Sequence, residues 1–328
     1  MNVHTYTQFP RLYQICYNIP MKPRNITPHA IILAAIILIF GAGVIILLRW
    51  DKGIPSDYDP SQVSTDFETE ALDFIMPPDE AWQARANDGP LNILCLGNNP
   101  FSDERGAYGL AEQIGTLTGA TVYNGAFPDT TIATRRSSEK ATDYLSLYFV
   151  TMALINRKYN YLESGVALSE NPATVAALDV LRGLNMKEMD IIVIMYDSTD
   201  YNERSPADNP SDAHDIYAYT GALRTSLEAI RQYLPHIRVI FMSHTYARYL
   251  DENGTLHNGA TYDLGNGTLP HYLILGQDTA IVSGVSFMDH YFGSIHEGNY
   301  ADYMSDHMHL NAAGRGLLAE RVAAVIAD

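Results

Sequence analysis

The stretch SDHMHLNAAG, residues 305–314, places a carboxylate and an imidazole close together before a C-terminal helical pattern. Asp306 and His309 are three residues apart, a spacing at which the carboxylate can hold one ring nitrogen while the other acts as a base. Asn311 is a natural cap for the amphipathic helix predicted over residues 311–327. The alternative for this stretch is a surface histidine beside a capping aspartate.

Upstream, short apolar runs alternate with longer helical patterns, which is typical of a parallel sheet covered by helices. The sequence predicts strands over residues 91–96, 121–123, 191–195, 238–242 and 285–288. It predicts helices over residues 108–117, 140–157, 172–184, 213–234, 269–282 and 311–327, and a tight turn at Asn253-Gly254. Because ligands of open parallel sheets bind beyond the carboxyl ends of the strands, we expect the site in the loops that follow them.

The N-terminal region contains a candidate membrane anchor. Residues 31–48, IILAAIILIFGAGVIILL, carry no charge and nearly cover the roughly 30 Å core of a bilayer. A buried core helix and a signal peptide cleaved after a start at Met21 are the alternatives; the second lacks a small-residue cleavage site. We therefore predict a cytoplasmic tail (1–29), a transmembrane signal anchor (30–49), an acidic linker (50–78) and one extracytoplasmic domain (79–328) at the plasma membrane, the basic residues before the anchor setting this orientation.

Charge divides unevenly along the chain. Residues 1–50 hold four basic and no acidic side chains, while the rest carry 17 basic and 38 acidic ones. The strongly acidic domain argues against nucleic-acid binding, because phosphate recognition needs clustered Lys and Arg. The two cysteines, Cys16 and Cys95, are too few for a disulfide framework or a cysteine-built zinc site, and we expect no cofactor.

The polar clusters at the predicted strand ends resemble the conserved blocks of the SGNH/GDSL hydrolases, over roughly residues 90–327. The resemblance rests on ILCLGNN (93–99), TVYNGAFPDTT (121–131), IMYDSTDYN (194–202) and DHMHLNAAG (306–314). It implies a three-layer, flavodoxin-like α/β sandwich, with His309 as the base and Asp306 as its orienting partner. It further implies a serine esterase or O-acyl (acetyl) hydrolase, acting here on carbohydrate of a bacterial cell envelope.

The resemblance fails at the residues that catalysis needs. Asn99 stands where the family has its nucleophilic serine, and an amide cannot be activated by a neighbouring imidazole. Asp129 replaces the glycine of the oxyanion hole, where a carboxylate aimed at the oxyanion would raise the barrier. Thr199 replaces the oxyanion-hole asparagine and could still offer one hydroxyl donor. Asp200, which follows it, matches the family pattern.

Several interpretations of this altered site stay open. Ser102 or Ser198 could serve as a displaced nucleophile, which would keep an esterase with a diverged active site. The other main hypothesis is that the chain is a catalytically inactive SGNH-fold protein that binds a glycan or another envelope partner. A zinc site is a further alternative, built from Asp306, His309 and the neighbouring histidines, namely His290, His296 and His307.

Overall fold

The structure is a computed structural model that describes residues 70–78, 82–83, 89–135, 140–169 and 171–327. These residues belong to one compact unit, Glu68–Asp328. The predicted tail, the anchor and the linker up to residue 69 lie outside the described residues. Within the described part of the chain, no helix has the length and apolar character needed to cross a membrane.

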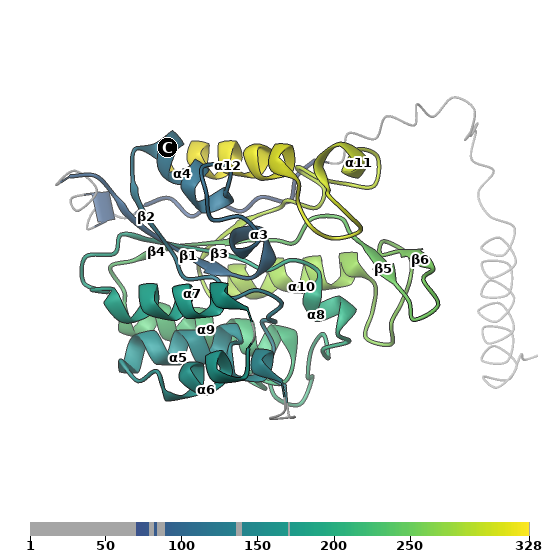
Figure 1. The fold of residues 1–328 in the computed structure, drawn as a ribbon, viewed down its shortest axis with the longest axis horizontal. Helices are drawn as coiled ribbons and strands as arrows, with labels where there is room; N and C mark the ends of the chain where they lie inside the picture. Colours follow the sequence, from purple (N-terminus) through teal and green to yellow (C-terminus); the bar gives the residue numbers. More distant parts are fainter. Residues whose placement is uncertain (1–69, 79–81, 84–88, 136–139, 170, 328) are drawn as a thin grey trace, which may run out of the picture. The chain divides into compact units, whose positions relative to one another are not determined.

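A five-stranded parallel sheet forms the centre of the domain, with strand order β2-β1-β3-β4-β7 (Figure 1). The strands are β1 (Asn92–Gly97), β2 (Thr121–Asn124), β3 (Ile191–Met195), β4 (Arg238–Met242) and β7 (Ser286–Met288). All five predicted strands are confirmed, with bounds that shift by at most one residue. Counting only these strands, the order is 2-1-3-4-5, as in flavodoxin-like sheets, so the predicted α/β fold class is confirmed.

Helices cover both faces of the sheet and complete three layers. Figure 1 shows α4 and α12 on one side and the other long helices on the opposite side. The long helices are α4 (Leu110–Thr118), α5 (Leu147–Asn156), α6 (Asn160–Leu168), α7 (Pro172–Gly183), α9 (Tyr219–Tyr233), α10 (Leu269–Val282) and α12 (Ala312–Ala327). Asn171 caps α7 by accepting a hydrogen bond from the backbone N–H of Ala173 at 2.9 Å, as the Asn-Pro pair predicts.

The central strand β3 shows why this sequence forms a doubly covered sheet. All five of its residues, IIVIM, are buried, as expected for a strand with helices on both faces. Ile192 and Ile194 belong to the apolar cluster under α7 and α9, whereas Ile191 and Val193 belong to the cluster under α4 and α12. Each such side chain contributes about 1.5–3 kcal/mol of burial energy, so both faces stabilise the sheet.

Two predicted helices differ from the structure by more than two residues, and each difference has a local cause. The helix predicted over 140–157 divides into a 3₁₀ turn, η1 (Ala141–Tyr144), and α5, since the backbone N–H of Leu147 bonds instead to Thr131 O at 3.2 Å. The helix predicted from residue 213 begins only at Tyr219. Asp212 and Asp215 accept hydrogen bonds from the backbone N–H groups two residues on, which favours turns over helix.

Three short helices, the longer helix α6 and one hairpin were not predicted. The short helices are α3 (Asn99–Ser102), α8 (Thr199–Asn202) and α11 (Tyr300–Tyr303), and the hairpin consists of β5 (Arg248–Leu250) and β6 (Leu256–Asn258). The predicted turn at Asn253-Gly254 is present between β5 and β6, where Gly254 has φ +81°. Of these elements, α3, α8 and the β5–β6 hairpin border the site.

The last residues of the predicted linker belong to the folded domain. Phe74 forms an antiparallel bridge with Phe287, with backbone hydrogen bonds of 2.9 and 2.7 Å, and so covers the edge of β7. Arg321 on α12 adds an ion pair to Asp73 at 2.6 Å. The fold therefore includes residues 70–78, and the linker ends before the predicted residue 78.

Candidate active site

The loops that leave the carboxyl ends of β1, β2 and β3 meet the loop before α12. Gly97 makes the turn out of β1 possible, because a Cβ there would lie 1.7 Å from Met195 O on the neighbouring strand. The chain then enters α3, whose first residue is Asn99. The arrangement brings residue 99 and His309 together although they are far apart in the sequence.

The predicted pair of Asp306 and His309 is formed. His309 Nδ1 lies 2.7 Å from Asp306 Oδ2, and Asp306 Oδ1 accepts the backbone N–H groups of Met308 and His309, each at 2.8 Å. Partial burial opposes ionisation of Asp306, but these hydrogen bonds prevail and lower its pKa to about 2. The carboxylate therefore fixes the loop and the ring that it carries.

His309 has the electrostatic surroundings of a base. Burial lowers its pKa, but the hydrogen bond to Asp306 and the charges of Asp103, Asp306 and Asp197 outweigh burial and raise the pKa above its usual value. With the Nδ1 proton directed at Asp306, Nε2 is free to accept a hydrogen bond. The group that it faces at 3.3 Å is the side-chain amide of Asn99.

The Asn99 amide is held on both sides, and the residue is only 2% exposed. Its Oδ1 accepts the backbone N–H of Asp129 at 2.9 Å, and its Nδ2 donates to Asp197 Oδ2 at 2.9 Å. The second Nδ2 hydrogen can point at Nε2 of His309. In this orientation both N–H groups of the Asn99 amide meet an acceptor. The amide is thus fully hydrogen-bonded at the position where the resemblance places a serine.

Asp197 is the centre of the buried network, and sequence reasoning missed it. Its carboxylate accepts hydrogen bonds from Asn98 Nδ2 at 2.7 Å, from Asn99 Nδ2 at 2.9 Å and from the backbone N–H of Thr199 at 2.9 Å. Asn98 Oδ1 accepts the backbone N–H of Asp197 in return, at 2.9 Å. The signal was present, since Asp197 is a carboxylate two residues after a buried strand in IMYDSTDYN.

Asp129 does not act as the sequence suggested. The residue is exposed, and its backbone N–H, not its carboxylate, points at Asn99. Its φ of +56° lies in the left-handed region, which costs a non-glycine residue about 1–2 kcal/mol. The backbone N–H of residue 129 is therefore directed at the side chain of residue 99 although the residue is not a glycine.

The sequence allowed the hydroxyl of Thr199 to donate to an oxyanion. In the structure this hydroxyl is already bound to another group. Thr199 Oγ1 donates to Asp197 Oδ1 at 2.5 Å. The neighbouring Asp200 accepts the backbone N–H groups of Ile132 and Ala133 at 2.7 and 3.1 Å and so holds the loop that follows Asp129. Burial raises the pKa of Asp200 to about 6, although these hydrogen bonds act to lower it.

Neither candidate serine is found in contact with His309. Ser102 Oγ is buried and has no hydrogen-bond partner within the part of the chain that the structure describes. Ser198 Oγ accepts a hydrogen bond from Asn202 Nδ2 at 3.2 Å. The structure thus brings together His309, Asp306, Asn99, Asp129 and Thr199, and it leaves Ser102 and Ser198 outside this set.

The zinc alternative is not supported. Among the described residues, no three histidine, cysteine or acidic side chains are placed to hold a metal ion. His290 lies in the interior, where its Nδ1 pairs with Ser294 Oγ at 2.9 Å. The ring of His296 instead accepts the backbone N–H of Gly298 at 3.1 Å.

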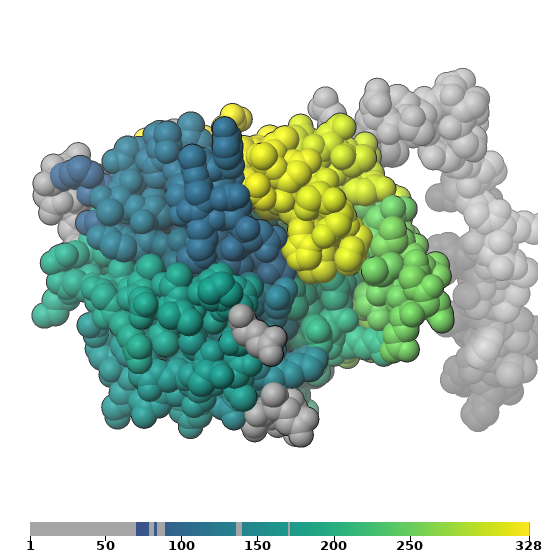
Figure 2. Space-filling model, viewed as in Figure 1, coloured from purple at the N-terminus to yellow at the C-terminus, as the bar shows by residue number. Residues whose placement is uncertain are grey.

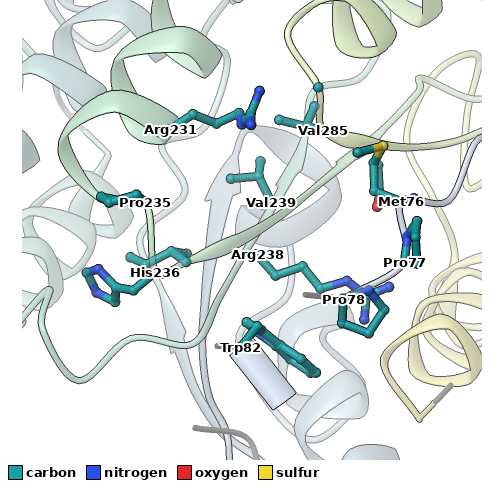
Figure 3. A pocket seen from close by; sticks show the side chains of 13 residues that line it. Met76, Pro77, Pro78, Trp82, Arg231, Pro235, His236, Arg238, Val239 and Val285 are labelled. Carbon is teal, nitrogen blue, oxygen red and sulfur yellow. Dashed lines mark hydrogen bonds between the residues drawn. The ribbon is translucent and has the colours of Figure 1, made fainter. Parts of the chain in front are cut away.

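A cavity of roughly 200 Å³ lies at the opposite end of the sheet, where β4 and β7 begin (Figure 3). Its lining includes Trp82, Arg231, Arg238 and Val285, and none of the residues predicted for the site. Because ligands of parallel sheets bind beyond the carboxyl ends of the strands, we place the candidate active site at His309 and not in this cavity.

Comparison with known proteins identifies the fold. No sequence-family model matches the chain, and no curated protein matches it. One solved structure aligns with 73% of this chain and 96% of its own, with 18% identity and a TM-score of 0.53. Together with the strand order, this likeness shows a flavodoxin-like α/β fold. This is the fold that the resemblance to the SGNH hydrolases implies.

Other solved structures of similar extent include named enzymes. Est24, a carbohydrate acetylesterase from Sinorhizobium meliloti, shares 14% identity over 72% of this chain and 98% of its own, with a TM-score of 0.43. A candidate SGNH hydrolase from Slackia heliotrinireducens shares 14% identity over 73% of this chain and 100% of its own, with a TM-score of 0.40. At position 99, where the resemblance to this family places a serine, the present chain has an asparagine.

Proposed function

We propose that this SGNH-fold protein binds its ligand at the Asn99–His309 site without forming a serine acyl-enzyme. One observation carries the proposal: the amide of Asn99, bonded to Asp129, Asp197 and His309, fills the nucleophile position. The lone pair of an amide nitrogen is delocalised into its carbonyl, so His309 cannot turn it into a nucleophile by removing a proton. The first step of serine-esterase chemistry is therefore missing.

The test is covalent labelling of the purified full-length protein with a fluorophosphonate probe, with peptide mapping of any adduct. We expect no labelled serine in the wild-type protein. A label on Ser102 or Ser198 that is lost in His309→Ala would establish a displaced nucleophile and overturn the proposal. A label that persists in His309→Ala would report a reactive residue outside this site, and the proposal would stand.

A second candidate function is favoured by the intact pair of His309 and Asp306. An SGNH-type hydrolase could use a water molecule activated by His309 to attack an O-acyl ester directly, with the backbone N–H of Asp129 stabilising the oxyanion. The water would have to displace the Asn99 amide from His309 Nε2, and the ester oxygen would have to displace it from the backbone N–H of Asp129. Turnover of activated acetyl esters that needs His309 but gives no fluorophosphonate adduct would support this function over binding alone.

The location of the protein and its ligand class are also proposals. We infer that residues 31–48 anchor the chain in the plasma membrane and that the domain, outside the cytoplasm, meets a cell-envelope glycan. The uncharged apolar run and the basic residues before it support the anchor. Protease added to intact cells should remove the domain, and full protection of the domain would contradict this orientation.

A further inference from the structure

The β5–β6 hairpin and the loop that follows it are fixed to the two loops that carry the site. The backbone N–H of Arg248 in β5 donates to His307 O at 2.8 Å, two residues before His309. The hydroxyl of Tyr201 in α8 donates to Tyr262 O at 2.7 Å. Figure 2 shows the light-green hairpin region adjoining the yellow C-terminal segment on one face of the domain. A ligand at His309 would therefore lie near this hairpin.

Three aromatic rings are stacked on one side of the hairpin. Tyr249 and His257 are directly opposite each other on β5 and β6, and side chains of such pairs share a face. The ring of Tyr262 stacks on His257 with centroids 4.0 Å apart and lies nearly parallel to Tyr249 at 6.0 Å. Tyr262 is nevertheless 37% exposed, so part of this residue remains accessible to a ligand.

Polar groups border the stack. His257 Nε2 pairs with Asp251 Oδ2 at 2.9 Å, and Arg204 Nη2 lies 3.4 Å from the hydroxyl of Tyr249. A rigid aromatic face with charged and hydrogen-bonding groups at its edge suits a pyranose ring, which has an apolar C–H face and a rim of hydroxyl groups. A purely apolar ligand would leave these polar groups unused.

Arg204 ends helix α8 in the left-handed conformation common at helix C-termini, with the backbone N–H of Ser205 donating to Asp200 O at 2.9 Å. The φ of Arg204 is +57°, in the left-handed region that residues other than glycine rarely adopt. Asn266 Nδ2 donates a hydrogen bond to the backbone carbonyl oxygen of Arg204 at 3.0 Å. This conformation fixes where the Arg204 side chain leaves the end of α8. A glycine at this position would relieve the strain but would remove the guanidinium beside Tyr249.

We propose that Tyr262, stacked on His257 and Tyr249 and flanked by Arg204, is a sugar-binding subsite for the glycan that enters the His309 site. The proposal rests on the proposed function, since it assumes a ligand at that site. It assigns to Tyr262 the stacking contact and to Arg204 a hydrogen-bonding contact with a neutral, equatorially substituted sugar ring.

The test is isothermal titration calorimetry of the full-length protein with cellotetraose and with N-acetylchitotetraose. We expect saturable binding of at least one. Tyr262→Ala should weaken it about three- to tenfold, the worth of one aromatic contact, whereas Tyr262→Phe should stay within about twofold. Arg204→Gly should weaken binding while its melting temperature stays equal or rises. Tyr233→Ala is the matched control, because Tyr233 is 60% exposed on α9, away from the hairpin.

Two outcomes would overturn the subsite. One is that Tyr262→Ala binds the oligosaccharide with the affinity of the wild-type protein. If His309→Ala loses binding in that case, the ligand lies at His309 alone and the subsite is still refuted. The other is the absence of saturable binding of both oligosaccharides by the wild-type protein. Either failure is distinct from a failure of the proposed function, because the fluorophosphonate test uses no sugar.

Discussion

Replacing Asn99 by serine tests how much the rebuilt network contributes to stability. In the wild-type protein the Asn99 amide donates to the Asp197 carboxylate, accepts the N–H of Asp129 and faces His309. A serine hydroxyl has one hydrogen and a shorter reach. It can keep one contact, to His309 or to Asp129, and it leaves Asp197 without one of its donors in a place that is only 7% exposed.

The expected loss follows from the bonds removed. A hydrogen bond to a charged group contributes about 1.5–3 kcal/mol and a neutral one about 0.5–1.5 kcal/mol. Losing the bond to Asp197 and one neutral bond should lower the free energy of unfolding of Asn99→Ser by about 2–4 kcal/mol. A loss of this size is large beside the 5–15 kcal/mol that a folded domain typically has.

Urea unfolding monitored by tyrosine and tryptophan fluorescence would measure this loss. The matched control is Asn156→Ser, which removes an exposed asparagine whose Nδ2 donates to Met152 O at 2.9 Å within α5. The control should stay within about 0.5 kcal/mol of the wild type. If Asn99→Ser also changed stability by less than about 0.5 kcal/mol, Asn99 would not be the saturated, structure-supporting amide described above.

Three further predictions concern the same region and the buried histidines. Asp200→Asn should cost about 2 kcal/mol in urea unfolding, because an amide can accept only one of the Ile132 and Ala133 N–H groups; an unchanged midpoint would refute this. Burial lowers the pKa of His244 to about 4, so its neutral form stabilises the fold above pH 6.5, and about 3 kcal/mol should be lost as the pH falls from 6.5 to 4. His244→Phe should flatten this pH dependence in thermal unfolding, and an identical slope would contradict the assignment. In the Asn99→Ser background, Asp197→Gly should increase fluorophosphonate labelling, because the negative charge of this neighbouring carboxylate opposes a developing oxyanion; equal labelling rates would show that Asp197 does not set the barrier.

The layers of the fold were predictable because their signals are local. The strand IIVIM and the apolar runs beside it are continuous, since both faces of the sheet are covered. Helix α10 has the predicted bounds, Leu269–Val282. The hairpin β5–β6 was not predicted as strands, because each has only three residues and its pairing depends on contacts with the loops of the site.

The site was predictable only in part. The spacing of Asp306 and His309 gives their contact directly, because the two residues share one loop. Asp197 and Asn98 are 99 residues apart, and their mutual hydrogen bonds arise only when β1 and β3 lie side by side. The role of Asp129 was misread, because residue type suggested a carboxylate in the site whereas the backbone conformation directs the N–H there.

The central claim is that this site keeps His309 as a base and the backbone N–H of Asp129 as a donor, and has Asn99 in the place of a nucleophile. The most direct measurement is the rate of fluorophosphonate labelling of the wild-type protein and of Asn99→Ser, each with and without His309→Ala, with the adduct mapped by peptide mass spectrometry. We predict no adduct at the site in the wild type and an adduct at position 99 in Asn99→Ser that disappears when His309 is also replaced. An adduct on Ser102 or Ser198 of the wild type that depends on His309, or no adduct at position 99 in a folded Asn99→Ser protein, would contradict the account.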